Sequence, residues 1–122
     1  MNQKQSLQLS FLLLSLSVSL GAVGAHLLQK TLTIKGLETF ETGARYLTYH
    51  SLGLLIISIN KNIYENLAWT KSLLLFGIFF FCGNCFLYSL TNIKVFAMLV
   101  PIGGFSFIIG WIVAIFEIKK FK

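Results

Sequence analysis

The sequence of this 122-residue chain is short of charge: charged residues make up 11% of it and hydrophobic residues 56%. A soluble domain averages about 25% charged residues. A soluble fold of this composition would expose large apolar patches and would aggregate. Proline occurs once, and the mean hydropathy is +0.79. These shortages exclude an ordinary soluble domain and indicate a chain whose main partner is a lipid bilayer.

The chain also lacks the short motifs that mark common catalytic and metal-binding sites. It contains no Walker loop, no His-Glu-x-x-His and no Gly-x-Ser-x-Gly. Its two histidines and two cysteines do not have the spacing of a complete metal site. We therefore expect no bound metal, no cofactor and no enzymatic activity.

Basic residues outnumber acidic ones, which gives a net charge of +6 and a pI near 9.6. Such a balance can indicate nucleic-acid binding, but here the basic residues are scattered and gather only at the end of the chain. They are Lys4, Lys30, Lys35, Arg45, Lys61, Lys71, Lys94, Lys119, Lys120 and Lys122. This arrangement is typical of the flanks of membrane helices, where lysine and arginine meet lipid headgroups. The expected partner is a membrane and not nucleic acid.

A helix needs about 20 residues to cross the hydrocarbon core of a bilayer. Apolar segments predict four such spans, at residues 7–28, 46–60, 72–90 and 95–118. The second is short, and the polar segment Lys35–Arg45 before it is expected to form either a short interfacial helix or an extension of the same helix. Four spans leave no room for a soluble domain. The predicted fold is an all-α, integral membrane four-helix bundle, with residues 1–122 as a single transmembrane domain.

The first span has a second interpretation. Its basic start, its apolar run and the small residues Ala22, Gly24 and Ala25 also resemble a signal peptide with a cleavage site. Because the apolar run is long enough to cross a bilayer, we expect a retained helix. With four spans both termini share one face, and that face holds six of the ten basic residues. The positive-inside rule then predicts that both termini lie in the cytoplasm.

The few ionisable residues gather with two tyrosines near the ends of the first two spans. They are His26, Glu41, Arg45, Tyr46, Tyr49 and His50. Glu41 and Arg45 have the spacing and order that favour an ion pair on a helix. Because consecutive helices run antiparallel, His26 and the start of the second span are expected to meet at one membrane face. This cluster is either a brace between helices or a proton relay or solute-binding pocket.

Small and hydroxyl residues predict where helices approach one another. On the first helix Ser15 and Ser19 recur at helical spacing beside a ridge made by Gly21 and Ala25. The same reasoning applies to the third and fourth spans. The full set of expected packing residues is Ser15, Ser19, Gly21, Gly24, Ala25, Gly83, Asn84, Pro101, Gly103, Gly104 and Gly110.

Four of the polar or unusual residues in these later spans need an interpretation of their own. Cys82 and Cys85 form a C-x-x-C, which we interpret as small packing residues and not as a redox pair or half of a zinc site. Asn84 lies in mid-membrane, so its amide is expected to bond to another helix. Pro101 predicts either a kinked, closely packed helix or a hinge.

Three groups of residues occur in the order typical of one family. They are Gly21–Leu27; Thr39–Gly43 with Tyr46 and His50; and Pro101–Gly104 with Gly110 and Trp111. The chain thereby resembles, over nearly its whole length, the uncharacterised bacterial membrane proteins of domain of unknown function 423, related to eukaryotic transmembrane protein 256. Its third helix departs from the family, with Phe81–Phe86 in place of Phe-Ser-Gly-Ser-Leu-Tyr. The resemblance implies a four-helix inner-membrane protein and brings no established activity.

Two functions are compatible with these observations. The first, which we favour, is a structural or accessory helical bundle that can assemble into a homo-oligomer. The second is a carrier or channel for a small solute, a proton or an ion, using the cluster of His26, Glu41, Arg45 and His50. That second function requires an oligomer, because 122 residues do not enclose a path on their own. The sequence does not identify a ligand.

Overall fold

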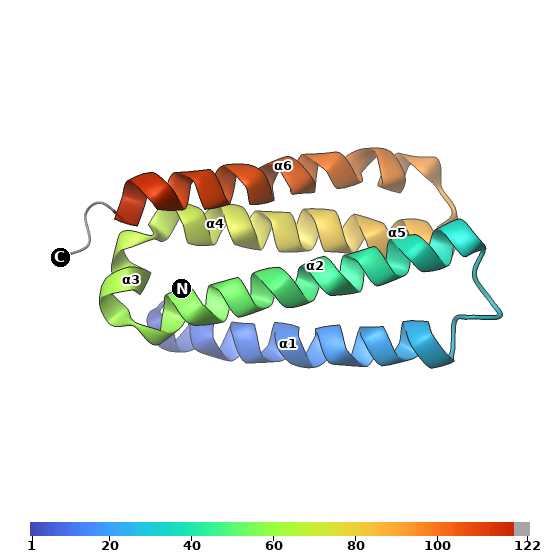
Figure 1. Cartoon of the computed structure of the whole chain (residues 1–122), viewed down its shortest axis with the longest axis horizontal. Coiled ribbons are helices and arrows are strands. Elements are labelled where there is room, and N and C mark those ends of the chain that lie inside the picture. The colour runs from blue at the N-terminus through green and yellow to red at the C-terminus, as the bar shows by residue number, and fades with distance from the viewer. Residues whose placement is uncertain (119–122) are drawn as a thin grey trace.

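The computed structural model describes residues 1–118, and in that part of the chain every regular element is a helix (Figure 1). In chain order they are α1 (Gln3–His26), α2 (Ile34–Ile59), α3 (Lys61–Asn66), α4 (Ala68–Gly77), the π-helix η1 (Ile78–Cys82), α5 (Gly83–Thr91) and α6 (Lys94–Glu117). α4, η1 and α5 follow one another without a break and form one helical segment. The predicted all-α class is confirmed.

The long helices lie alongside one another, and each packs on its neighbours in chain order (Figure 1). α1 packs on α2, α2 packs on the α4–η1–α5 segment, and that segment packs on α6. The N-terminus, α3 and the C-terminal end of α6 lie at one end of the molecule. The α1–α2 and α5–α6 connections lie at the other end. α1 and α6 are the first and last helices in this order, and the main neighbour of α1 is α2.

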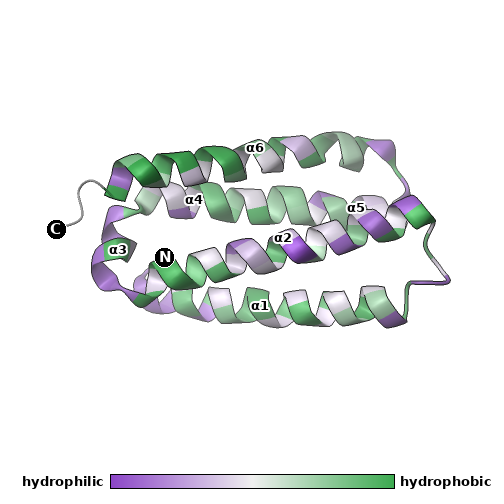
Figure 2. Cartoon of the chain, in the orientation of Figure 1, coloured by the Kyte–Doolittle hydropathy of each residue, from purple (hydrophilic) through white to green (hydrophobic). Residues whose placement is uncertain are grey.

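Three helical segments are long and apolar enough to cross a membrane. They are Gln3–His26, Ala68–Thr91 and Lys94–Glu117, each with 24 residues. α2 is longer, with 26 residues, but its first half carries Lys35, Glu38, Glu41 and Arg45. Figure 2 shows the contrast, since hydrophilic purple interrupts α2 whereas much of α6 is hydrophobic green. Hydrophobic composition therefore singles out three of the long helical segments and leaves α2 as the polar one.

Side chains fix where the helices begin. The Asn2 side chain accepts the backbone N–H of Gln5, and the Gln5 side chain accepts that of Asn2, which forms a capping box for α1. Thr33 Oγ1 accepts the backbone N–H of Gly36 and caps α2. α2 therefore starts at Ile34, and the polar segment before the predicted second span is an extension of that helix. The α5 helix ends at Asn92, whose φ of 57° gives the left-handed turn into α6.

The core lies where α2, the α4–η1–α5 segment and α6 meet, and glycines let them approach closely. A Cβ at Gly103 of α6 would lie 2.3 Å from the backbone nitrogen of Phe81 in η1. Gly77 of α4 lies under the ring of Phe107, where a Cβ would come within 2.5 Å of ring carbons. Gly53 of α2 lies in the same way under Trp111, at 2.8 Å. Small residues of this kind allow helices to make the close contacts that hold membrane proteins together.

Candidate functional site

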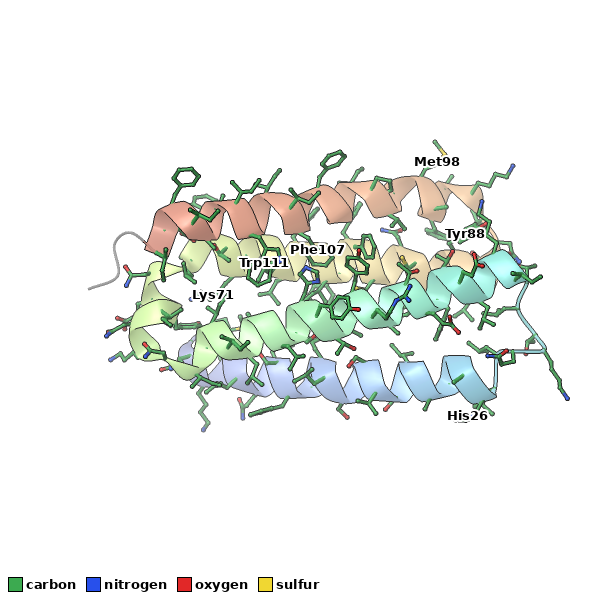
Figure 3. The ribbon with its side chains drawn as sticks, in the orientation of Figure 1. His26, Lys71, Tyr88, Met98, Phe107 and Trp111 are labelled. Carbon is green, nitrogen blue, oxygen red and sulfur yellow. The ribbon has the colours of Figure 1, made fainter. Side chains whose placement is uncertain are left out.

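His50 lies in the core. Its side chain is 6% exposed, and its ring stacks on Phe107 of α6 with centroids 3.5 Å apart and planes 14° from parallel. Its Nδ1 is 2.8 Å from the carbonyl oxygen of Tyr46, one turn earlier in α2. The centroid of the Trp111 ring lies 6.0 Å from that of the imidazole. Figure 3 shows Phe107 and Trp111 between α6 and α2. His50 therefore contributes to the contact between α2 and α6.

The two tyrosines lie at the edge of this aromatic core. The Tyr46 ring has its centroid 4.8 Å from that of Phe81 and 5.9 Å from that of His50, and the residue is 38% exposed. Tyr49 is 56% exposed and meets the edge of Tyr46 at 5.7 Å. Tyr46 thus extends the packing around His50, whereas most of Tyr49 faces outward.

Glu41 and Arg45 are both exposed, on the side of α2 that faces α1. The predicted ion pair between them is wrong: within residues 1–118 their charged atoms do not come within 4.0 Å of each other. Instead the Arg45 guanidinium turns toward the start of α2 and donates a hydrogen bond to Thr42 Oγ1 at 3.2 Å. An exposed pair of this kind gains little from closing, because side-chain entropy opposes the weak attraction. Both charges remain available to another partner.

A groove of about 350 Å³ runs between α1 and α2 at the level of these two charges. We call it the α1–α2 groove. Its lining residues are Ser17 and Gly21 of α1 and Glu41, Ala44, Arg45 and Thr48 of α2. Among the described residues no group of three or more His, Cys, Asp or Glu side chains could hold a metal ion, here or elsewhere.

His26 does not reach this groove. It is exposed at the end of α1, and Figure 3 shows it on the outer side of that helix. A Cβ at Gly24 would lie 2.9 Å from the Phe40 ring, so the last turn of α1 is level with the part of α2 that precedes Glu41. The expected convergence is wrong because α2 starts at Ile34, which places Arg45 well inside the helix. The predicted single cluster is divided among three places: the core, the groove and the end of α1.

The packing face of α1 is also different from the predicted one. Ser15, Ser19, Gly21 and Ala25 are exposed, and nothing lies within 4 Å of a Cβ built at Gly21. The buried residues of α1 are Ser6, Ser10, Leu13, Ser17 and Gly24. The reason is that α1 carries small residues on two faces. Only contact with α2 selects one of them.

Hydrogen bonds near the end of α2 determine which face of α1 packs against α2. Ser6 Oγ and Ser58 Oγ are 2.7 Å apart, and Ser58 Oγ also donates to the carbonyl of Leu54. Gln3 Nε2 donates to the Ser58 carbonyl oxygen at 2.8 Å. These bonds fix the register of α1 on α2. The sequence carries a signal for them only in the serines themselves, which occur throughout the chain.

The third-helix residues behave differently from one another. Cys82 and Cys85 are both buried and free, at 2% and 1% exposure. The Asn84 amide nitrogen donates to the carbonyl of Phe80 at 2.5 Å, so it bonds within its own segment and the expected partner on another helix is wrong. Nothing lies within 4 Å of a Cβ at Gly83, so this glycine is not a close-packing position.

In the fourth long segment, Pro101 is an exposed residue inside α6, which continues on both sides of it. Among the described glycines, a Cβ at Gly103 would make the closest contact with another backbone, and a Cβ at Gly110 would lie 3.2 Å from Leu73 Cβ. Gly104 has only ordinary contacts, at 3.6 Å from the Phe81 ring. Of the two adjacent glycines, one is required by packing and the other is not.

A carboxylate that the sequence did not single out holds α4 to α6. Glu117 accepts the backbone N–H groups of Trp69 and Thr70, each at 3.0 Å, and the hydroxyl of Thr70 at 2.8 Å. α4 has no side-chain cap of its own, so Glu117 supplies one from another helix. An anionic group there is also favoured by the helix dipole. No local pattern predicts this contact, because the two residues are far apart in sequence.

Comparison with known proteins gives a consistent result. Residues 20–104 match the family model described as protein of unknown function DUF423. A UPF0382 membrane protein of Staphylococcus epidermidis is 40% identical over 107 residues, which are 87% of this chain and 88% of the relative. The UPF0382 membrane protein YwdK of Bacillus subtilis is 35% identical over 109 residues, 87% of this chain and 89% of the relative.

A more distant relative carries a more specific location in its name. The UPF0382 inner membrane protein YgdD of Escherichia coli is 32% identical over 96 residues, which are 77% of this chain and 73% of the relative. No solved structure matches the chain significantly. The family match, the relatives' names and three helices able to cross a membrane agree with one another. This chain belongs to the DUF423 family of small bacterial membrane proteins.

Proposed function

We propose that the protein is a four-span bundle of the bacterial inner membrane, with α1, α2, the α4–η1–α5 segment and α6 as its spans and both termini in the cytoplasm. Three of these segments have the required length and composition, and α2 lies alongside them. Lys4 and Lys61 lie at the end of the molecule that also holds the N-terminus. Lys119, Lys120 and Lys122, which the topology prediction also uses, lie outside the described residues. Counted along the sequence, six of the ten basic residues flank the spans on the side of the termini, and this count supports the cytoplasmic assignment.

Within that bundle the protein acts as a non-enzymatic structural or accessory component. The observation that carries this proposal is the separation of the polar residues that a relay would need to bring together. His50 is enclosed by Phe107, Tyr46 and Trp111, whereas Arg45 lies in a groove on another side of α2. A chain of proton transfers requires neighbours within hydrogen-bond reach. The arrangement favours helix packing as the role of His50.

The proposal is tested by measuring flux and stability on the same samples. The full chain, reconstituted in vesicles, should give no more flux of protons, ions or small solutes than empty vesicles do. His50→Ala should lower the free energy of unfolding in detergent by about 2 to 4 kcal/mol, because it leaves a cavity against Phe107. His26→Ala is the matched control and should change stability little, since His26 is exposed. Flux that depends on pH and disappears in Arg45→Ala would contradict the structural role.

A second candidate function has one observation in its favour. The α1–α2 groove offers a carboxylate and a guanidinium that are not paired with each other. An oligomeric carrier or channel would use them if α1 of one copy closed the groove of another. The flux assay separates the two functions, provided that it is repeated on chemically cross-linked oligomers.

A further inference from the structure

In the α1–α2 groove, opposite charges face an open space between two long helices. Glu41 and Arg45 line it from α2, and Ser17 and Gly21 line it from α1. Gly21 leaves that space open, since no atom lies within 4 Å of a Cβ built there. Unpaired charges are costly next to lipid unless a polar partner reaches them. A molecule with both an anionic and a cationic group would therefore pair with both charges of the groove.

The depth of the groove, given the four-span placement proposed above, is that of lipid headgroups. The 26 residues of α2 extend about 39 Å at 1.5 Å per residue, which exceeds the hydrocarbon thickness of about 30 Å. Counting about 20 residues back from Ile59 brings the hydrocarbon boundary to Phe40. Glu41 is then at the boundary, and Arg45 is one turn inside it. Because the guanidinium turns back toward Thr42, it approaches headgroup level as well.

Farther along the contact between α1 and α2, toward the membrane centre, the surface on the side of the groove becomes apolar. Leu52 follows Thr48 by one turn of α2, and Leu14 of α1 lies two turns from Gly21, toward the N-terminus, on the same face. Leu52 is 43% exposed, and Leu14 is half-buried. The surface is thus polar in the groove, at the membrane boundary, and apolar beyond the groove, toward the membrane centre. A phospholipid has this order of groups along its length.

We propose that the α1–α2 groove binds a phospholipid whose headgroup carries an ammonium group beside its phosphate. The phosphate accepts hydrogen bonds from Arg45, and the ammonium lies against the carboxylate of Glu41. One acyl chain follows the apolar surface beyond the groove. Glu41 makes the site selective, because a carboxylate repels a headgroup that is anionic overall and attracts one that carries a cation.

A second copy of the chain is a poorer occupant of this groove. Two copies in the same membrane orientation place equal residues at equal depth, so a two-fold axis along the membrane normal would bring Arg45 toward Arg45 and Glu41 toward Glu41. Like charges facing each other near lipid are unfavourable. A lipid with a dipolar headgroup satisfies both charges at once.

The test uses the full chain in nanodiscs that contain equal amounts of phosphatidylethanolamine and phosphatidylglycerol. After detergent extraction, native mass spectrometry counts the lipids that remain bound. We expect one retained phospholipid, with phosphatidylethanolamine enriched about tenfold over its share in the nanodisc. Arg45→Gln should reduce retention to the background level. Glu41→Gln should keep a bound phospholipid but lose the preference for phosphatidylethanolamine.

Two variants separate occupancy of the groove from charge and from folding. Gly21→Leu fills the groove without changing a charge and should also abolish retention, while the melting temperature stays within a few degrees of the parent's. Gly83→Leu is its matched control. Nothing lies within 4 Å of a Cβ built at this glycine either, but Gly83 belongs to α5 and does not line the α1–α2 groove, so retention should be unchanged. Lys35→Gln, which removes an exposed cation of α2 outside the groove, should likewise leave retention unchanged.

Several results would overturn the proposal. One is retention that is equal in the parent chain, Arg45→Gln and Gly21→Leu. Another is a dimer that Gly21→Leu disrupts, because a second copy would then fill the groove. Soluble phosphoethanolamine that binds without lipid, and displaces the retained phospholipid at millimolar concentration, would mean that the site takes a free solute. Lipid retention and flux are measured independently. A result that contradicts lipid binding therefore does not contradict the structural role, and flux that contradicts the structural role does not contradict lipid binding.

Discussion

The two sides of α2 are packed by different means. On the side facing α6 and the α4–η1–α5 segment, the Trp111 ring of α6 lies directly over Gly53 of α2, and next to this contact Phe107 of α6 lies over Gly77 of α4. On the side facing α1, serines form the contact, and a groove remains open beside them. The first side is a close-packed core, and the second is a hydrogen-bonded seam.

This difference follows from what stabilises helices in lipid. Lipid tails are as apolar as leucine, so the association of helices depends on van der Waals contact and on hydrogen bonds between them. The core side gains most from contact, since bulky rings fill the space that glycines leave. The α1 seam gains most from hydrogen bonds, which are individually modest in membranes. We therefore expect changes on the core side to have larger effects than changes on the α1 side.

The largest effect is expected at Gly103, on the core side. Gly103→Ala would put a Cβ 2.3 Å from the Phe81 backbone nitrogen, so a helix must shift, and the free energy of unfolding should fall by about 3 kcal/mol. Gly104→Ala is the matched control, because its Cβ would meet only ordinary contacts at 3.6 Å. It should be neutral or stabilising by up to about 1 kcal/mol. Unfolding in detergent measures both, and equal losses would show that the close approach at Gly103 is not required.

The next effect is expected at Glu117, which joins the C-terminal end of α6 to the N-terminal end of α4. Glu117→Ala leaves the backbone N–H groups of Trp69 and Thr70 without this acceptor, so stability should fall by about 2 kcal/mol. Glu65→Ala removes an exposed carboxylate that forms only a 3.8 Å ion pair with Lys61, and should cost less than about 0.5 kcal/mol. Thermal unfolding of the two variants side by side is the measurement. A loss in Glu65→Ala as large as that in Glu117→Ala would argue against a specific cap.

The smallest effect is expected on the α1 seam. Ser58→Ala removes the hydroxyl that meets Ser6 and should lower stability by about 1 kcal/mol. Ser51 is an internal comparison, since its buried Oγ has no hydrogen-bond partner among the described residues. Ser51→Ala should therefore be neutral or slightly stabilising. If Ser58→Ala proved more damaging than Gly103→Ala, the ranking of the two sides of α2 would be reversed.

Local patterns predicted the helices well and their contacts poorly. Apolar runs located α1, the α4–η1–α5 segment and α6. A helix that crosses a bilayer needs an uninterrupted apolar stretch, and the length of such a stretch is a local property of the sequence. For the polar segment before the second span the sequence left two alternatives, a short interfacial helix or an extension of the second helix. The structure shows the extension, because Thr33 caps a helix that starts at Ile34. The predicted meeting of Arg45 with His26 was wrong, because Arg45 lies well inside α2 and lines the groove that His26 does not reach.

The contacts between helices depend on rotation about the helix axes, which periodicity does not fix when several faces look alike. α1 offers small residues on more than one face, and the predicted face with Ser15 and Ser19 is exposed. Gly103 and Gly104 are neighbours with the same residue type, yet only one of them lies against another backbone. Glu117 reaches the start of α4 across a long separation in sequence. No single-sequence pattern carries these choices.

The sequence by itself determined the class of the protein. Few charges, long apolar runs and the ordered blocks of its family are local properties, and together they specify an all-helical membrane protein. The tertiary structure alone decided that His50 belongs to an aromatic core, that Arg45 lines a groove and that His26 faces outward. The physical reason is that hydrophobicity fixes which residues leave water, whereas helix rotation and register fix which side chains meet. Helix rotation and register depend on packing between segments that are far apart in the chain.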